Sequence, residues 1–505
     1  MKLQKNIFKY LSFALLGLVS IGYYGLIINL MQTADYRFFY LFIISIHLIN
    51  AVTMILVFTR NSQPLTKLSW LIFIFIFPLV GNFAYFAFGT GFKNKNEKKI
   101  KNDPRFINTS YIDANELQKL RTESELRNYE VLNKNIALNA KFDFFEEGYK
   151  FYDHLFERIE EAEKSIEIVT YIIKRGEIAT RLINLLTKKA NEGVKIRWII
   201  DYFGSSLVST KYFGKLKHHD NVEIVYAGKI YYPFITGTSF YRNHQKFYII
   251  DKKVVLSGGN NISDEYASFS PKYGHWIDLN YSIRGPYVNN YIIQFAYYWE
   301  VVTGKRIPID GLANVSSGLE ELYKDQALLV SETPVNDFSN TESHWLKLIA
   351  SAKSTLKIVT PYFSISDPLW KQLYIAIKSG VKVDVYIPGL PDKEFVYKIT
   401  LNEVRELQKL GMNVHVYKDH FIHSKVGIID EKIAWTGSVN FDFRSMYTQY
   451  ENMDLFTGES VNDIVHIVNK YEQKCVSLEE FDKLENMKES GRFSKLLIKI
   501  FKPLV

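Results

Sequence analysis

One spacing of residues occurs twice in this chain and constrains its fold more than any other feature. A histidine is followed by a lysine two positions later, an aspartate seven positions later and a glycine-led turn fourteen positions later. The first copy runs from His244 to Asn261 and the second from His423 to Asn440. With 11 histidines in the chain, the first part of this pattern should arise by chance only on the order of 0.1 times, so a matched pair indicates a duplicated structural unit.

The segments around the two copies also follow the same order. In each half a helix-periodic segment leads into an apolar strand, and a second helix, a glycine turn and two further strands follow. The predicted strands lie at 164–170, 193–200 and 222–226 in the first half and at 353–360, 380–387 and 414–417 in the second. Strands that alternate with helices of this length form parallel or mixed sheets. The sequence therefore predicts an α/β fold with two tandem, similar domains.

The rest of the sequence divides the 505-residue chain into four parts. We expect a membrane region at 1–92, a polar linker at 93–140, a first α/β domain at 141–310 and a second at 311–505 that ends in a basic tail. Charged residues make up 23% of the chain and aromatic residues 15%, which excludes both a disordered chain and one that lies wholly in a membrane. The single cysteine, Cys475, excludes an internal disulfide and a multi-cysteine metal cluster.

The expected membrane region contains three apolar stretches, at 10–31, 38–59 and 68–88. The first two are uninterrupted, and each is long enough to cross about 30 Å of hydrocarbon as a helix. A cleaved signal peptide is the alternative for the first stretch, but the stretch exceeds the usual apolar run of about 7 to 15 residues. The third stretch carries Pro78 and Gly81 in its middle, which favours a break over a straight span.

Lysine clusters flank this region, before the first stretch and again after the third, at Lys2, Lys5, Lys9, Lys93, Lys95, Lys98, Lys99 and Lys101. Both clusters should stay on the cytoplasmic side of a membrane, and three full crossings cannot satisfy both. We therefore expect two crossings plus a re-entrant or interfacial hairpin. That topology describes a multi-pass protein of the cell membrane with its two α/β domains in the cytoplasm.

The net charge of +8 suits anionic partners, and both nucleic acid and anionic lipid qualify by charge alone. The C-terminal residues 492–505 interleave leucine and isoleucine with three lysines. Two interpretations of this tail stay open. It is either a basic amphipathic helix that lies on anionic lipid or an ordinary helix that packs on its own domain.

The repeated motif has a chemical meaning. Positions i and i+2 of a strand face the same side, so His244 and Lys246 present an imidazole and an ammonium side by side, as do His423 and Lys425. The glycine-rich turn lets the backbone and a short polar side chain approach an anion. Brought together, the two faces would form a phosphate site with a nucleophile and an acid. Because lysines repel a cation and no carboxylate cluster accompanies the histidines, we expect no metal and no other cofactor.

These residues resemble the duplicated motifs of the phospholipase D superfamily, which meet in one active site at the interface of two similar domains. The resemblance covers residues 151–456. Within that superfamily the architecture resembles that of the bacterial cardiolipin synthases, in its apolar N-terminal segments, its stretch with Trp70 and Pro78 to Gly81, and its basic C-terminus. The resemblance implies that the enzyme condenses two phosphatidylglycerol molecules into cardiolipin and glycerol. These lipids are then its partners, with no nucleic acid; the sequence indicates no oligomeric state.

The resemblance also implies a role for each residue of the motifs. One histidine attacks phosphorus to form a phosphohistidine, and the other acts as acid and base. By similarity the attack falls to His244 and the acid/base role to His423, although the residues themselves leave this order open. The residues expected to neutralise or bind the phosphate are Lys246, Lys425, Asn261, Asn440 and Ser438.

Four acidic residues complete the expected site. Asp278 and Glu451 stand where superfamily members place carboxylates that orient the histidines. Asp251 and Asp430 belong to the motifs, and we expect them to fix the strand and turn rather than to touch substrate. The first motif has Gly259 where the second has Ser438, so the two half-sites should donate hydrogen bonds unequally.

Several related functions use the same residues. A phospholipase D hydrolase transfers the phosphatidyl group to water, and a phosphatidylserine-type transferase uses another alcohol. A nuclease of the superfamily is favoured only by the positive charge, and an inactive membrane scaffold is disfavoured by two intact motifs. The apolar N-terminal region favours a lipid acceptor, because a site held at the bilayer meets a second lipid before water.

Overall fold

The computed structural model describes residues 36–60, 64–89, 94–133, 135–206, 208, 210–214, 216–230, 237–269, 275–316 and 322–485, with a few single residues outside these ranges. The chain forms two compact units. One comprises Met1–Lys93 and Lys229–Tyr241, and the other comprises Asn94–Gly228 and Arg242–Val505. The predicted first span at 10–31 and the basic tail at 492–505 lie almost entirely outside the described residues.

The first unit is apolar and helical. Its elements are α2 (Tyr36–Thr59), α3 (Pro64–Ile76), α4 (Pro78–Ala84), the π-helical turn η1 (Tyr85–Gly89) and the short 3-10 helix η6 (Gly237–Phe240). Among the described residues, Arg37–Thr59 is the one helical segment long and apolar enough to cross a membrane. The third apolar stretch breaks between α3 and α4, as predicted from Pro78. A Cβ on Gly81 would lie 2.6 Å from Ile74 Cα, so glycine allows α4 to approach α3 closely.

The second unit begins with the segment predicted as a polar linker, which is largely helical. It contains α5 (Lys95–Ile100), η2 (Pro104–Phe106), η3 (Asn108–Tyr111), α6 (Ala114–Glu123) and α7 (Arg127–Glu130). Polar side chains begin these helices: Asn94 accepts a hydrogen bond from the Glu97 amide, and Asp113 accepts from the amides of Asn115 and Glu116. The polar composition thus reflects helix caps and exposed helix faces as well as loops.

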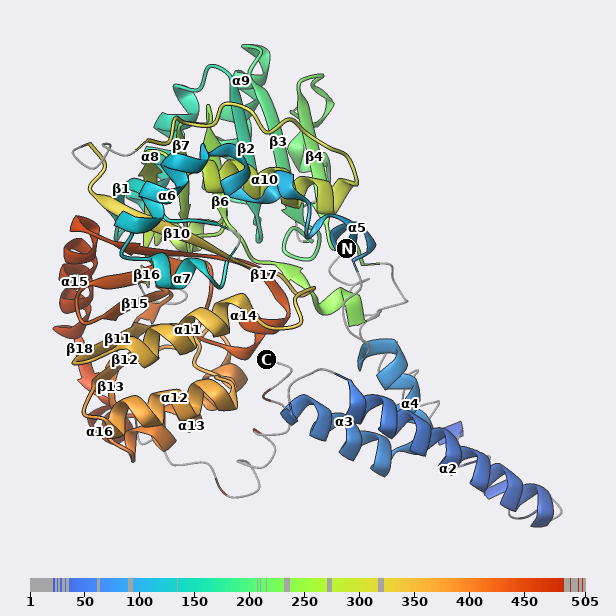
Figure 1. The fold of residues 1–505 in the computed structure, drawn as a ribbon. Helices are drawn as coiled ribbons and strands as arrows, with labels where there is room; N and C mark the ends of the chain where they lie inside the picture. The colour runs from blue at the N-terminus through green and yellow to red at the C-terminus, as the bar shows by residue number, and fades with distance from the viewer. Residues whose placement is uncertain are drawn as a thin grey trace. The chain divides into compact units, whose positions relative to one another are not determined.

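One continuous sheet forms the centre of the second unit (Figure 1). The first half contributes, in spatial order, β4 (Val222–Ala227), β3 (Lys195–Asp201), β2 (Ser165–Thr170), β6 (Phe247–Ile250), β7 (Val254–Gly258), β9 (Asn280–Arg284) and β1 (Leu138–Phe145). The second half contributes β10 (Asp325–Glu332), β17 (Gln449–Thr457), β16 (Ile433–Gly437), β15 (Val426–Ile429), β11 (Thr355–Val359), β12 (Lys382–Pro388), β13 (Asn413–Tyr417) and β18 (Cys475–Ser477). Apart from the added β18, the two orders mirror each other, which confirms the predicted tandem α/β halves.

The halves are joined edge to edge. β1 pairs antiparallel with β10, with Leu138 opposite Ala327, so the sheet passes from one half into the other without interruption. The parallel strands β2, β3 and β4 and their counterparts β11, β12 and β13 lie toward the two outer ends of the sheet. Because a parallel pair needs a crossover, a helix separates β2 from β3 and β11 from β12.

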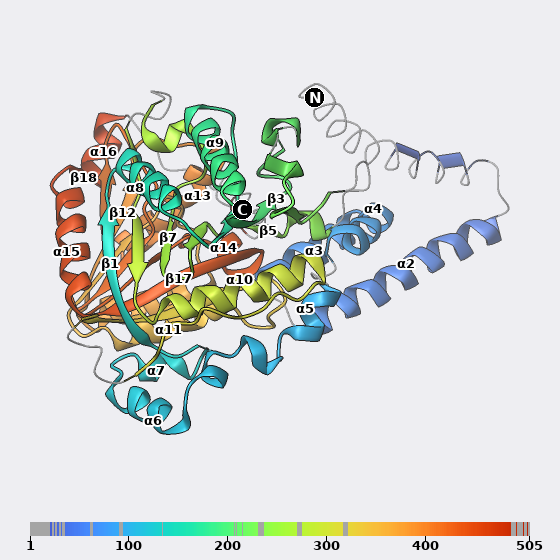
Figure 2. The ribbon, with the colours of Figure 1, turned by 90° about the horizontal axis from the view of Figure 1, so that it is seen from above.

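Helices cover both faces of the sheet. They are α8 (Gly148–Glu160), α9 (Glu177–Asn191) and α10 (Val288–Thr303) in the first half, and α11 (Asn340–Ser351), α12 (Asp367–Lys378), α13 (Glu394–Gln408), α14 (Phe443–Tyr447), α15 (Glu459–Glu472) and α16 (Leu478–Leu484) in the second. Figure 2 shows α10 and α11 on the same side of the sheet, and both contact β10. Each half keeps its own core, with Trp198 fully buried in the first and Trp345 in the second.

Candidate active site

Both motif histidines lie where a short strand of one half pairs with the other half. β5 (Arg242–Asn243) pairs in parallel with β17, and the His244 amide donates to the carbonyl oxygen of Tyr450 at 2.9 Å. β14 (Phe421–Ile422) pairs with β8 (Trp276–Ile277), and the His423 amide donates to the carbonyl oxygen of Ile277 at 2.6 Å. Both histidines are buried. Each motif histidine is therefore held by a backbone hydrogen bond to the other half.

The carboxylates are exchanged between the halves. His244 Nδ1 lies 2.9 Å from Glu451 Oε1, and His423 Nδ1 lies 2.6 Å from Asp278 Oδ2. A carboxylate at Nδ1 fixes the ring and keeps the proton on that nitrogen, which leaves Nε2 as the basic atom. Each half thus supplies the orienting acid for the histidine of the other half, a pairing that the linear sequence did not reveal.

The two lysines are buried beside the histidines. Lys246 Nζ donates to the His244 carbonyl at 2.6 Å, and Lys425 Nζ lies 3.0 Å from His423 Nε2. Burial lowers the pKa of Lys246 to about 7 and that of Lys425 to about 8, against the attraction of Asp278 and Glu451. An anion that entered this site would attract both ammonium groups and so raise their pKa values again, which favours the charged lysines.

The surroundings of the two histidines favour their neutral form. Burial and then Lys425 lower the pKa of His423 to about 4, even though Asp278 opposes the shift. Burial and then Lys246 lower the pKa of His244 well below its usual value. Burial also raises the pKa of Glu451 to about 7. At neutral pH the site therefore offers unprotonated imidazoles, the state that a nucleophile requires, beside a largely protonated Lys425 and a partly protonated Lys246.

The three residues expected to bind phosphate make hydrogen bonds within the protein. Ser438 Oγ donates to Glu451 Oε2 at 2.5 Å, so it supports the carboxylate behind His244. Asn261 accepts from the Ile172 amide at 3.1 Å and donates to the Tyr266 hydroxyl at 2.5 Å. Asn440 Nδ2 lies 3.4 Å from Ser445 Oγ, whereas its buried Oδ1 has no hydrogen-bond partner among the described residues.

Gly259 differs from its counterpart Ser438 for a steric reason. A Cβ at Gly259 would lie 2.1 Å from Asp278 Oδ1, so the carboxylate of Asp278 occupies the space that a side chain would need. The first glycine of each motif is also constrained, because Gly258 and Gly437 have φ angles of 147° and 152°. The unequal motifs therefore correspond to two different ways of placing a carboxylate behind a histidine.

The motif aspartates lie at the opposite end of their strands from the histidines. Asp251 accepts hydrogen bonds from the amides of residues 163–165, and Asp430 accepts from the amides of residues 353–355. Both aspartates have positive φ angles of 50°. Asp251 thus fixes the turn before β2, and Asp430 fixes the turn before β11, each to the end of its own motif strand. The structure shows no contact between either aspartate and the histidines.

Aromatic rings that the sequence analysis did not select surround the histidines. The Tyr171 ring lies 4.9 Å from the His244 ring, and the rings of Trp276 and Tyr266 lie 5.2 Å and 5.7 Å from the His423 ring. Tyr171 directly follows the predicted strand at 164–170, and Trp276 stands two residues before Asp278. The sequence could have pointed to Tyr171 and Trp276, because Tyr171 lies at the end of a predicted strand and Trp276 lies close to Asp278. These rings exclude water from the imidazoles.

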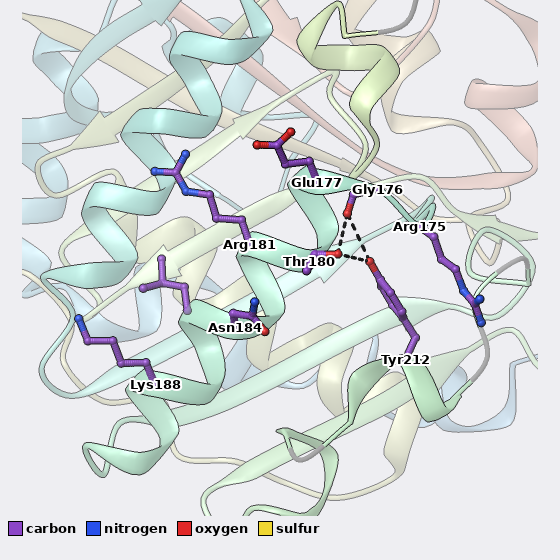
Figure 3. A pocket seen from close by; sticks show the side chains of 9 residues that line it. Arg175, Gly176, Glu177, Thr180, Arg181, Asn184, Lys188 and Tyr212 are labelled. Atoms are coloured by element: carbon purple, nitrogen blue, oxygen red, sulfur yellow. Dashed lines mark hydrogen bonds between the residues drawn. The ribbon is translucent and has the colours of Figure 1, made fainter.

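An open pocket elsewhere on the first half contains none of the motif residues (Figure 3). Its volume is about 720 Å³, and its lining includes Arg175, Arg181 and Lys188. The Tyr212 hydroxyl and Thr180 Oγ1 lie 2.8 Å apart in it. The described residues also include no group of three or more His, Cys, Asp or Glu side chains arranged to hold a metal ion.

Both the sequence and the fold have matches among known proteins. The family model described as "Cardiolipin synthase, PLD-like domain" matches residues 155–275 and 345–475, and the model "Phospholipase_D-nuclease N-terminal" matches residues 46–89. The chain is 30% identical over 430 residues to the cardiolipin synthase of Alkalihalophilus pseudofirmus, which covers 81% of this chain and 83% of that protein.

A second relative and a solved structure extend the comparison. The cardiolipin synthase of Oceanobacillus iheyensis is 28% identical over 476 residues, which are 90% of this chain and 97% of that protein. The crystal structure of phosphatidylserine synthase from Haemophilus influenzae superimposes with a TM-score of 0.56 at 14% identity, over 76% of this chain and all of that one. At that identity the likeness is one of fold.

Proposed function

The chain belongs to the cardiolipin synthase family of phospholipase D-like proteins, and we propose that it transfers a phosphatidyl group from one phosphatidylglycerol to another, giving cardiolipin and glycerol. One observation carries this proposal: each motif histidine is bound to a carboxylate of the other half and lies beside a buried lysine. Such a site is built to hold one phosphate between a nucleophile and an acid.

The first half of the reaction forms a covalent intermediate. His244 Nε2 attacks phosphorus, the bond from phosphorus to the glycerol oxygen breaks, and His423 gives its proton to that oxygen. Burial depresses the pKa of His423 to about 4; the negative charge of the bound phosphodiester raises this pKa again, so that His423 takes up from solvent the proton that it then donates. Lys246 and Lys425 neutralise the charge on the phosphoryl oxygens. Glu451 stabilises His244 as its ring becomes cationic.

The second half reverses these steps with a new alcohol. His423 takes the proton from the free hydroxyl of a second phosphatidylglycerol, and the resulting oxygen displaces His244 from phosphorus. One phosphodiester bond is broken and one is formed, so the exchange needs no nucleotide. A lipid acceptor is supported by the family and by the apolar helix Arg37–Thr59, because a site held near a bilayer meets a second lipid before water.

The direct test uses purified protein and phosphatidylglycerol labelled in its acyl chains. We expect cardiolipin as the main product, with unchanged yield after exhaustive treatment with EDTA. His244→Ala and His423→Ala should each reduce turnover to below a few per cent of wild type, because the two residues act as a unit. Phosphatidic acid in place of cardiolipin would identify a hydrolase, and substantial activity in either variant would rule out the shared site.

A further inference from the structure

Two cations outside the motifs stand near the active site. Arg444 lies on α14 and is partly exposed, and the side chain of Lys393, at the start of α13, is 63% exposed. The charge of each contributes to the low pKa of His244, so both lie within electrostatic range of its ring. The transfer chemistry above uses neither residue.

Arg444 is connected to Glu451 through the side-chain amide of Gln449. With the Gln449 amide oriented to satisfy both of its groups, its nitrogen donates to Glu451 Oε1 at 3.1 Å and its oxygen accepts from Arg444 Nε at 3.3 Å. The same Glu451 oxygen lies 2.9 Å from His244 Nδ1. This contact uses only the Nε hydrogen, and the guanidinium has four further N–H groups that could bind an anion.

Lys393 lies at the start of a series of aromatic rings that ends at His423. Its ammonium lies 5.1 Å from the centre of the Tyr362 ring, and the Tyr362 hydroxyl donates to Asp392 at 2.6 Å. The Tyr362 ring lies 6.4 Å from that of Phe421, which is 5.6 Å from the His423 ring. Lys393 is 4.0 Å from Asp392, a weak ion pair at the surface that an incoming anion could replace.

The acceptor of the proposed reaction brings a second negative charge to a site whose two motif lysines face the phosphodiester of the donor. The donor lipid places one phosphodiester between the histidines. The acceptor lipid brings a second phosphodiester, three carbons from the hydroxyl that must reach the first phosphorus. Two anions at that separation repel each other in a dry site, so an uncompensated second phosphate would hold the acceptor away.

We propose that Arg444 and Lys393 form a second phosphate subsite that binds the phosphodiester of the acceptor phosphatidylglycerol. The inference rests on the proposed function and names the residues that select its acceptor. Arginine suits such a subsite because its planar N–H groups match two phosphate oxygens at once. An acceptor that lacks a phosphate, such as free glycerol, makes no use of these two residues.

The test compares two acceptors in the same preparation. Cardiolipin formation uses a charged acceptor, whereas incorporation of labelled glycerol into phosphatidylglycerol uses a neutral one and shares the phosphohistidine step. In Lys393→Gln we expect cardiolipin formation at low phosphatidylglycerol to fall about tenfold or more, while glycerol exchange changes by less than about twofold. Arg444→Gln also removes the partner of Gln449 behind Glu451, so both reactions should slow, but cardiolipin formation should fall about tenfold further than glycerol exchange. Arg444→Lys, which retains the charge but not the planar fork, should fall between wild type and Arg444→Gln.

Lys398→Gln is the matched control, since Lys398 is an exposed lysine on the same helix α13 and the substitution removes the same charge. It should leave both reactions unchanged. Equal losses in both reactions for Lys393→Gln and Arg444→Gln, or no loss in either, would overturn the subsite. A wild-type protein that exchanges glycerol but makes no cardiolipin would instead refute the proposed function and the subsite with it.

Discussion

At the scale of single residues, Gly259 leaves the space that the carboxylate of Asp278 occupies. The second motif has serine at this position, and Ser438 supports Glu451 with a hydrogen bond. In the first motif the carboxylate of Asp278 already fills that space, 2.1 Å from where a Cβ would stand. The two half-sites therefore reach the same result, an oriented histidine, with different residues.

This difference predicts that making the motifs alike will harm the enzyme. Gly259→Ser should displace Asp278, disorient His423 and lower kcat about a hundredfold or more, although it copies the residue of the other half. Ser438→Ala removes one hydrogen bond to a carboxylate and should cost about tenfold. The measurement is cardiolipin synthesis at saturating substrate, with intact folding checked by thermal melting. A Gly259→Ser protein as active as wild type would contradict the steric argument.

The site should also show a narrow dependence on pH. Glu451, whose pKa burial raises to about 7, must lose its proton to orient His244, so activity rises with pH through that value. Lys246 and Lys425, with pKa values lowered to about 7 and about 8, must keep theirs to bind phosphate, so activity falls above those values. We expect a bell-shaped kcat/KM with its maximum near pH 7, which reports the coupled cluster rather than single residues.

In Glu451→Gln the acidic limb of this profile should disappear while the alkaline limb remains, since glutamine does not titrate. Turnover should also be lower, because the ring of His244 loses its anionic partner. A wild-type kcat/KM that stayed flat from about pH 6 to 9 would show that neither the carboxylate nor the lysines titrate in this range.

At the scale of elements, α5 is bound to the strands that carry the site. Glu97 is buried on α5 and accepts hydrogen bonds from the hydroxyls of Tyr297 on α10, Thr333 after β10 and Tyr450 on β17. Tyr450 immediately precedes Glu451, and its carbonyl binds the His244 amide. One carboxylate thus fixes the first helix of the second unit to the strand that holds the His244 amide.

We therefore expect Glu97→Ala to destabilise the second unit by roughly 3 kcal/mol, because three buried hydroxyls lose their acceptor at about 1 kcal/mol each. Glu97→Gln keeps one acceptor oxygen and should lose less. The measurement is the shift in melting temperature of the purified protein, with cardiolipin synthesis as a second readout. Glu116→Ala, at a partly exposed position in the same helical segment, is the control. Equal stability of Glu97→Ala and wild type would exclude the proposed role of α5.

At the scale of the whole molecule, the lysines on both sides of the apolar region predict a cytoplasmic location for the α/β halves. A single cysteine placed at Asn102, with Cys475 replaced, should resist membrane-impermeant thiol reagents in intact cells and react after permeabilisation. A cysteine in the same background at a position shown to face outward provides the positive control. Rapid labelling of position 102 in intact cells would refute the cytoplasmic location and the positive-inside argument on which it depends.

The sequence by itself determined the duplication, the strands, the break at Pro78 and the residues that form the two motifs, because each of these is written in local spacing or periodicity. Only the tertiary structure decided which partners meet. The exchange of Glu451 and Asp278 between the halves follows from the pairing of β5 with β17 and of β14 with β8, and these contacts join residues far apart in the chain. The helical character of the polar segment 94–133 and the burial of Glu97 have the same origin, since a polar residue becomes a structural one only when distant donors surround it.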